Sequence, residues 1–118
     1  MGFSNPLVVR LEAREWDIAS AEQLGDILAV ACDRPDVVID MSAVEYFDST
    51  CLGKLARVHA KRAEKGFPAA RLVIRSPQVR RIFHVVQYDR LWPIFDSLEA
   101  ALGDANGECA PSEARPPQ

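Results

Sequence analysis

Residues 37–53 read VVIDMSAVEYFDSTCLG and decide the fold of the chain. The run from Val37 to Met41 is apolar at almost every position, which predicts a strand that is buried on both faces. A short loop follows and delivers two hydroxyl side chains, Ser49 and Thr50, to the first turn of a basic helix. Because the N-terminus of a helix stabilises a phosphate group, this stretch indicates a switch rather than a catalyst.

Upstream of this stretch, the sequence predicts one strand and one helix. Residues 7–11 form a short apolar run rich in β-branched side chains, typical of a strand, and residues 12–17 form a turn. Ser20 and Gln23 have the spacing of a capping box. The helix that follows has one buried stripe at helical period, made of Leu24, Ile27, Leu28 and Ala31.

The central helix is predicted from about Ser49 to Lys65, and Gly66 and Pro68 end it. Its inner stripe is expected to contain Leu52, Leu55, Ala56, His59 and Ala63. Its outer face is expected to carry Lys54, Arg57, Lys61, Arg62 and Lys65. The simplest interpretation of these cations is a solvated face, and the alternative is contact with an acidic partner.

Downstream, residues 71–75 predict a strand, and Ser76 and Pro77 begin a further helix. The buried face of that helix is expected to contain Val79, Ile82, Phe83 and Val86. Residues 91–95 form a short extended piece whose proline favours the edge of a sheet. A last helix begins near Asp96 and ends at Gly103. Strands that alternate with helices predict an α/β fold, with helices packed on a small mixed, partly parallel sheet.

The composition fits one domain with a core of its own, and we expect it to span residues 7–103. Residues 1–6 are expected to be a flexible N-terminus, and the polar, proline-rich residues 104–118 a disordered tail. The 118 residues include 14 basic and 17 acidic side chains, a net charge of −3, which argues against nucleic-acid binding. No signal peptide or membrane insertion is predicted. The three cysteines, odd in number and widely spaced, favour a reducing cytoplasm over disulfides or zinc.

Two segments, VVIDMS at residues 37–42 and FDSTCLG at residues 47–53, together resemble the STAS domain family, and in particular its anti-sigma factor antagonists. WDIAS at residues 16–20, Gly66, SPQVRRIF at residues 76–83 and DRLW at residues 89–92 also fit, so the resemblance covers about residues 7–103. Three departures stand out. Cys51 replaces a usual glycine, Arg14 to Asp17 replace Gly-Glu-Leu-Asp, and Gln87-Tyr88 replaces Gly-Leu.

The resemblance implies a partner-switching regulator of bacterial transcription. The partner would be an anti-sigma factor that is also a serine kinase. The unphosphorylated chain would bind it and free a sigma factor, and phosphorylation of Ser49, with Thr50 as the fallback site, would end that binding. Asp17, Asp48 and Cys51 would contact the partner together with the two hydroxyl residues. The chain would act as a monomer or weak homodimer without a cofactor.

The resemblance leaves one alternative function open, and the residues argue against another. STAS modules also serve as cytoplasmic subunits of transporters and as parts of stress-sensing complexes. An enzyme is disfavoured, because the sequence has no phosphate-binding glycine loop and no base placed beside Ser49. His59 and His84 have no partners at metal-ligand spacing, so no metal site is predicted.

Each acidic or thiol residue of the candidate site also has a structural interpretation. Asp48 and Asp17 could simply cap the helices that follow them, and Asp17 could alternatively contact the kinase or a metal-bound nucleotide on it. Cys51 could be a small buried side chain, or a redox-sensitive thiol whose pKa the helix N-terminus lowers.

Overall fold

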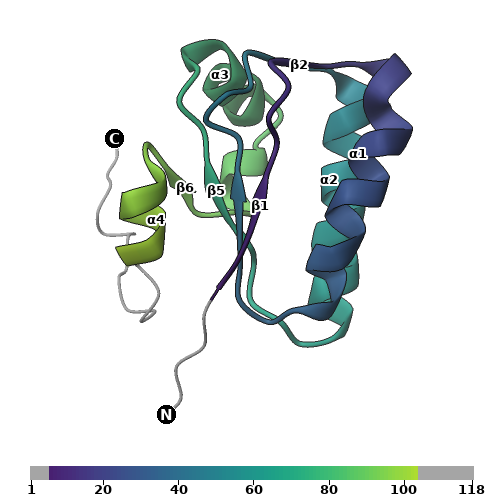
Figure 1. The fold of residues 1–118 in the computed structure, drawn as a ribbon, viewed down its shortest axis with the longest axis vertical. Helices are drawn as coiled ribbons and strands as arrows, with labels where there is room; N and C mark the ends of the chain where they lie inside the picture. The colour runs from purple at the N-terminus through teal and green to yellow at the C-terminus, as the bar shows by residue number, and fades with distance from the viewer. Residues whose placement is uncertain (1–5, 104–118) are drawn as a thin grey trace.

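The computed structural model describes residues 6–103, which form an α/β fold (Figure 1). Thirteen elements follow one another: β1 (Leu7–Arg10), β2 (Glu15–Trp16), η1 (Ile18–Ser20), α1 (Ala21–Leu28), η2 (Ala29–Asp33), β3 (Val37–Asp40), β4 (Tyr46–Phe47), α2 (Ser49–Glu64), β5 (Arg71–Val73), α3 (Pro77–Val85), η3 (Tyr88–Arg90), β6 (Ile94–Phe95) and α4 (Leu98–Gly103). The predicted α/β class is confirmed. The expectations for residues 1–6 and 104–118 concern residues that, apart from Pro6, lie outside the described range.

The main sheet has four strands in the order β1-β3-β5-β6. The sequence predicted a mixed, partly parallel sheet, whereas every strand pair within residues 6–103 is parallel. The reason is that a helical crossover separates each strand of this sheet from the next and returns the chain in the same direction. The expected edge position of residues 91–95 is confirmed for Ile94–Phe95, which form the outermost strand.

The central strand β3 is buried on both sides, as its apolar run predicted. Val37 and Ile39 belong to the large core between the sheet and α1, α2 and α3, whereas Val38 packs in a smaller core with Val73 and Ala101. Figure 1 shows α1 and α2 beside one face of the sheet and the short α4 beside the other. Burial on both faces therefore explains why consecutive positions of β3 are apolar.

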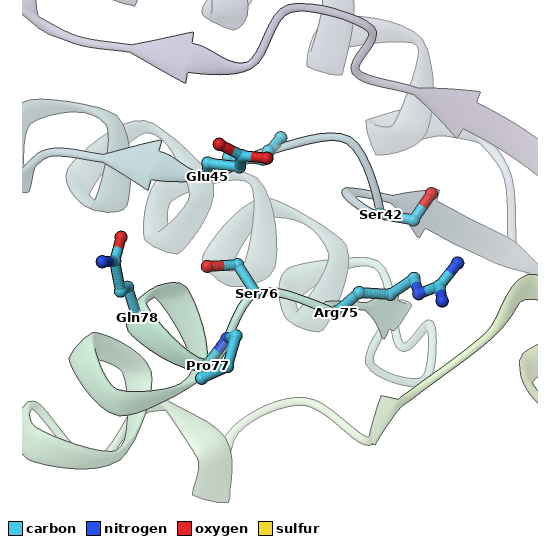
Figure 2. A pocket seen from close by; sticks show the side chains of 7 residues that line it. Ser42, Glu45, Arg75, Ser76, Pro77 and Gln78 are labelled. Atoms are coloured by element: carbon cyan, nitrogen blue, oxygen red, sulfur yellow. The ribbon is translucent and has the colours of Figure 1, made fainter.

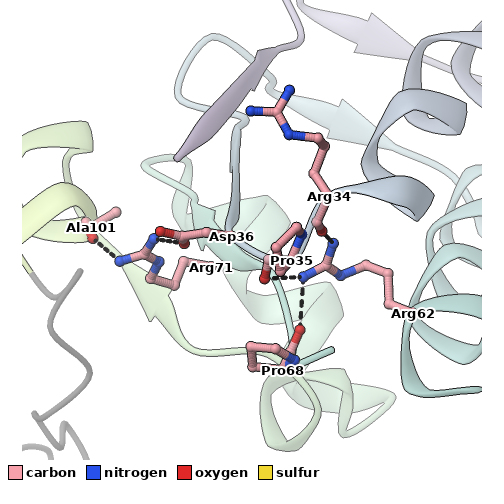
Figure 3. Close-up of polar contacts among 7 residues, drawn as sticks. All are labelled: Arg34, Pro35, Asp36, Arg62, Pro68, Arg71 and Ala101. Carbon is pink, nitrogen blue, oxygen red and sulfur yellow. Dashed lines mark hydrogen bonds and ion pairs between the residues drawn. The ribbon is translucent and has the colours of Figure 1, made fainter. Parts of the chain in front are cut away.

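Arg62 is the main correction to the predicted faces of α2. Its side chain was expected on the outer face, but the residue is only 1% exposed. Its guanidinium donates a hydrogen bond to the carbonyl oxygen of Ala31 at 2.7 Å. It also donates to the carbonyl oxygens of Pro35 at 3.1 Å, Pro68 at 2.8 Å and Arg34 (Figure 3). Ala31 belongs to η2, and Arg34, Pro35 and Pro68 lie in connecting segments, so the fork of N–H donors ties α2 to both regions. Burial lowers the pKa of Arg62 from its usual value.

Other side chains of the helices also differ from expectation. On α2, Leu52 and Leu55 are buried as predicted, but Ala63 is exposed and Val58 takes a place in the core. Val86 lies just after α3 and is 44% exposed rather than buried. The predicted capping box of Ser20 and Gln23 is also wrong, because the Ser20 side chain bonds back to Asp17 and makes no cap bond to α1.

A second buried cation fixes the C-terminal helix to the sheet. Arg71, at the start of β5, pairs with the Asp36 carboxylate and donates a hydrogen bond to the carbonyl oxygen of Ala101 at 3.0 Å (Figure 3). Its side chain is 8% exposed. The pairing with Asp36 offsets the cost of burying the guanidinium, so one side chain joins β5, α4 and the segment before β3.

Candidate functional site

A two-residue parallel ladder brings together the segments that carry the acidic residues of the candidate site. Strand β2 pairs with β4, with Trp16 opposite Phe47. The backbone N–H of Asp48 then donates to the carbonyl oxygen of Trp16 at 3.1 Å. The turn that begins at Asp17 therefore lies beside the turn that begins α2, although the two are 31 positions apart in the sequence.

Asp48 is the N-cap of α2, as its structural interpretation predicted. Its backbone is extended, and its Oδ1 accepts the backbone N–H of Cys51 at 3.1 Å. The carbonyl oxygen of Asp48 accepts the N–H of Leu52 at 3.0 Å, which closes the first turn. The carboxylate also carries a negative charge next to the positive end of the helix dipole, which adds to the stabilisation.

Ser49 and Thr50 are the first two residues of α2, and both are exposed. Their side chains follow a cap that is already made, so neither hydroxyl is needed to hold the turn. Within residues 6–103, no side-chain hydrogen bond engages either hydroxyl, and the carboxylate of Asp48 is turned to the helix backbone. The structure thus presents two free hydroxyl groups on a rigid helix start.

Cys51 is fully buried, with 0% of its surface exposed. Its thiol lies 3.5 Å from the carbonyl oxygen of Asp17, to which it donates a weak hydrogen bond. Burial, with a smaller contribution from the negative charge of Asp48, raises the pKa of the Cys51 thiol to about 11. This contradicts the redox hypothesis, which required a lowered pKa, and supports the buried-side-chain interpretation. Cys51 therefore supports the site from within the core, and its buried side chain is not accessible to a partner.

Asp17 caps the turn that it begins. Its Oδ1 accepts the N–H of Ala19 at 3.0 Å, and its own N–H donates to Ser20 Oγ at 3.0 Å. This reciprocal capping box belongs to the short helix η1 rather than to α1. The residue is exposed beside Cys51 and the start of α2, so its structural role leaves its outer surface open.

Two large apolar side chains near the site escaped the sequence analysis. Ile18 follows Asp17 and is 72% exposed, and Tyr46 precedes Phe47 and is 49% exposed. The signal for Tyr46 was the alternation of a strand, since its neighbour Phe47 is buried and adjacent side chains point to opposite faces. Ile18 gave no such signal, because it lies in a single turn of 3₁₀ helix.

The described part of the chain also has an open depression at the carboxyl ends of β3 and β5 (Figure 2). Ser42 and Glu45 line it from the loop after β3, and Arg75, Ser76 and Gln78 line it from the start of α3. It contains none of the predicted site residues. Glu45 is engaged by Arg14, whose guanidinium lies 3.2 Å from the carboxylate.

The two histidines take up separate structural positions. His59 is half-buried and meets the Trp92 ring edge-on at a centroid distance of 5.2 Å. His84 is exposed, with its Nδ1 2.9 Å from the Asp89 carboxylate. Among residues 6–103, no three His, Cys, Asp or Glu side chains are grouped as metal ligands. No helix in that range is long and apolar enough to cross a membrane.

Comparison with known proteins places the whole arrangement in one family. Residues 4–95, most of the chain, match the family model described as "Mlab, STAS domain". The chain belongs to the STAS domain family. Among curated proteins, none matches this STAS domain significantly.

Solved structures agree with the family assignment. An anti-sigma factor antagonist from Mycobacterium paratuberculosis is 31% identical to this STAS domain, with a TM-score of 0.73, and the match covers 84% of each chain. An anti-sigma-factor antagonist (STAS) domain protein from Planctomyces limnophilus is 25% identical, with a TM-score of 0.66. That match covers 75% of this chain and 78% of the other.

Proposed function

We propose that this STAS domain is an anti-sigma factor antagonist that phosphorylation of Ser49 switches off. In its unphosphorylated form it binds an anti-sigma factor, which then releases a sigma factor. The anti-sigma factor is also the serine kinase that modifies Ser49, and Thr50 is the fallback site. The proposal rests on the similarity to solved antagonists and on one structural observation, the exposed Ser49 hydroxyl at the start of a capped helix.

The position of Ser49 is suited to a reversible charge. A phosphate adds about −1.5 to −2 charges, and the first turn of α2 stabilises such a group through its N–H groups and dipole. The domain therefore keeps its fold in both states. The substitution of Cys51 for the usual glycine is compatible with this, because the Asp48 cap on the Cys51 N–H is intact and the thiol fits in the core.

The phosphate acts mainly on the affinity for the partner. Asp48 directly precedes Ser49, and the β2–β4 ladder brings the turn that carries Asp17 beside the start of α2. A partner surface complementary to a neutral hydroxyl would meet a dense negative charge after phosphorylation, and the cost of repulsion and desolvation at an interface reaches several kcal/mol. We propose that Asp17, Asp48, Ser49 and Thr50 contact the partner directly and that Cys51 contributes by holding their two turns together.

The same geometry supports a binding module rather than an enzyme. His59 lies on α2 almost three helical turns beyond Ser49 and packs against Trp92, so it is not placed to activate the hydroxyl. We further propose that the domain acts in the cytoplasm, where sigma factors function, and that it does so as a monomer or weak homodimer.

The proposal is tested by mass spectrometry of the protein isolated from its native cells together with bound partners. We expect phosphate on Ser49 and co-purification of a kinase-like anti-sigma factor, with loss of the phosphate in a Ser49→Ala strain. A matched Thr50→Ala strain should keep it. Recovery of transporter or stress-complex proteins, with Ser49 unmodified under all conditions, would instead support the alternative function and leave Ser49 as a structural residue.

A further inference from the structure

The outer face of α2 continues directly from the hydroxyl residues of the site. We define this face by the exposed residues that follow one side of the helix at spacings of three and four positions: Ser49, Thr50, Gly53, Arg57, Ala60, Lys61 and Glu64. The opposite side of α2 enters the core through Cys51, Leu52, Leu55, Val58 and Arg62. The outer face is therefore the part of α2 that the domain leaves uncovered.

The charges on this face are open. Arg57 and Lys61 are exposed, and within residues 6–103 neither takes part in an ion pair. Glu64, the one carboxylate on the face, is also absent from the ion pairs of this range, so the face carries two cations against one anion. A basic face on a chain of net charge −3 is complementary to an acidic surface.

Gly53 gives this face a second unusual feature. It lies inside α2, where glycine is one of the least favourable residues. A Cβ added to it would meet no atom within 4 Å, and its φ is not positive. Neither close packing nor backbone conformation within the described domain requires a glycine here. A molecule that packs directly on the helix backbone, one turn from Ser49, would require it.

We infer that the outer face of α2 docks an acidic surface of the anti-sigma factor, an inference that rests on the proposed function. The closest approach is at Gly53, and Arg57 and Lys61 face carboxylates of the partner. The interface that begins at Ser49 and Thr50 then continues along two further turns of α2. The basic face contributes to partner specificity and to the association rate, whereas the phosphorylation state of Ser49 determines whether the complex is stable.

The test is the affinity of the purified domain for the anti-sigma factor that co-purifies with it, measured by calorimetry at about 50 and 300 mM NaCl. We expect Arg57→Glu/Lys61→Glu to weaken binding at least about tenfold at low salt and to reduce the salt dependence seen for the wild type. Gly53→Gln, which favours the helix, should weaken binding at least about tenfold without lowering the melting temperature. The matched control is Arg81→Glu/Arg90→Glu, the same charge change on α3 and η3, which should bind like the wild type.

The outcomes separate this inference from the proposed function. If the wild type binds and all α2 variants bind equally well, the docking surface is wrong and the antagonist function stands. If the control weakens binding as much as Arg57→Glu/Lys61→Glu, total charge rather than this face is responsible, which also overturns the inference. If the wild type does not bind an anti-sigma factor at all, the proposed function fails and the inference fails with it.

Discussion

At Cys51, the position at a helix N-terminus and the burial of the side chain shift the pKa of the thiol in opposite directions. The first turn of a helix lowers the pKa of a cysteine, which is why the sequence suggested a redox-sensitive residue. In the folded domain, burial and the Asp48 carboxylate outweigh the helix and raise that pKa to about 11. The sequence could place Cys51 in the first turn, but its burial depends on the folded core and on distant segments such as the Asp17 turn.

The raised pKa has a consequence for stability at high pH. The unfolded thiol loses its proton near pH 9.0 and the folded thiol only near pH 11. Between these pH values, deprotonation stabilises the unfolded state relative to the folded state. We expect the free energy of unfolding to fall over this window by roughly 1–2 kcal/mol because of Cys51. Urea unfolding of the wild type and of Cys51→Ala at pH 8 and pH 10.5 measures the effect. An identical pH dependence of the two proteins would refute it.

Gln87 occupies a backbone conformation that favours glycine. Its φ of 63° lies in the left-handed region, just after α3, where this chain has Gln87-Tyr88 in place of the Gly-Leu of similar STAS domains. We expect Gln87→Gly to raise the free energy of unfolding by about 0.5–1 kcal/mol, because glycine relieves the strain of this region. Gln87→Ala keeps that strain and serves as the control in urea unfolding. A glycine variant no more stable than the alanine variant would argue against strain at this position.

The capping role of Asp48 can be separated from its charge. Asp48→Ala removes the acceptor for the Cys51 N–H and should lower the free energy of unfolding by about 1 kcal/mol. Asp48→Asn keeps an acceptor of the same shape and should recover most of this loss. Thermal and urea unfolding give the two values. Equal destabilisation by both changes would mean that the charge, and not the hydrogen bond, supports α2.

At the scale of the elements, α2 shows how single residues of a correctly predicted helix can be assigned to the wrong face. Its strong apolar residues are few, and a phase set partly by Ala56 and Ala63 placed Arg62 outside. In the structure, the buried side of α2 contains Leu55 and Val58. Arg62 lies one turn after Val58 on that same side. The carbonyl groups that accept hydrogen bonds from Arg62 could not be predicted from the helix itself, because they belong to the segments around residues 31–35 and 68.

Arg62 should be one of the most sensitive positions of the domain. Arg62→Met keeps much of the side-chain volume but leaves four carbonyl oxygens without their donor. We expect the free energy of unfolding to drop by about 2–4 kcal/mol. Arg57→Met, on the exposed face of the same helix, is the matched control and should change it by less than about 0.5 kcal/mol. Similar urea midpoints for the two variants would show that the buried hydrogen bonds do not stabilise the fold.

At the scale of the whole molecule, the α/β class could be predicted because strands and helices alternate and because β3 is apolar on both faces. The site could be predicted only in part. Ser49, Thr50 and the Asp48 cap follow from a local signature, whereas the approach of Asp17 depends on β2 and β4. Strands of two residues are too short to show a period in the sequence, so this ladder, and Ile18 and Tyr46 beside it, required the structure.

Under the proposed function, the whole domain is a rigid platform on which the Ser49 hydroxyl controls a binding equilibrium. The core, the Arg62 hydrogen bonds and the Asp48 cap fix α2, so a phosphate on Ser49 would change only the surface that a partner meets. Phosphorylation should therefore leave the melting temperature nearly unchanged while it changes affinity.

The most direct test is the affinity of the co-purifying anti-sigma factor for two forms of the purified domain, unmodified and carrying phosphoserine at position 49. Ser49→Ala serves as a control that binds but cannot be switched. We expect the unmodified domain and Ser49→Ala to bind with similar affinity and the phosphorylated domain at least about a hundredfold more weakly, a difference of about 2.7 kcal/mol. Equal affinity of the modified and unmodified forms would contradict the account.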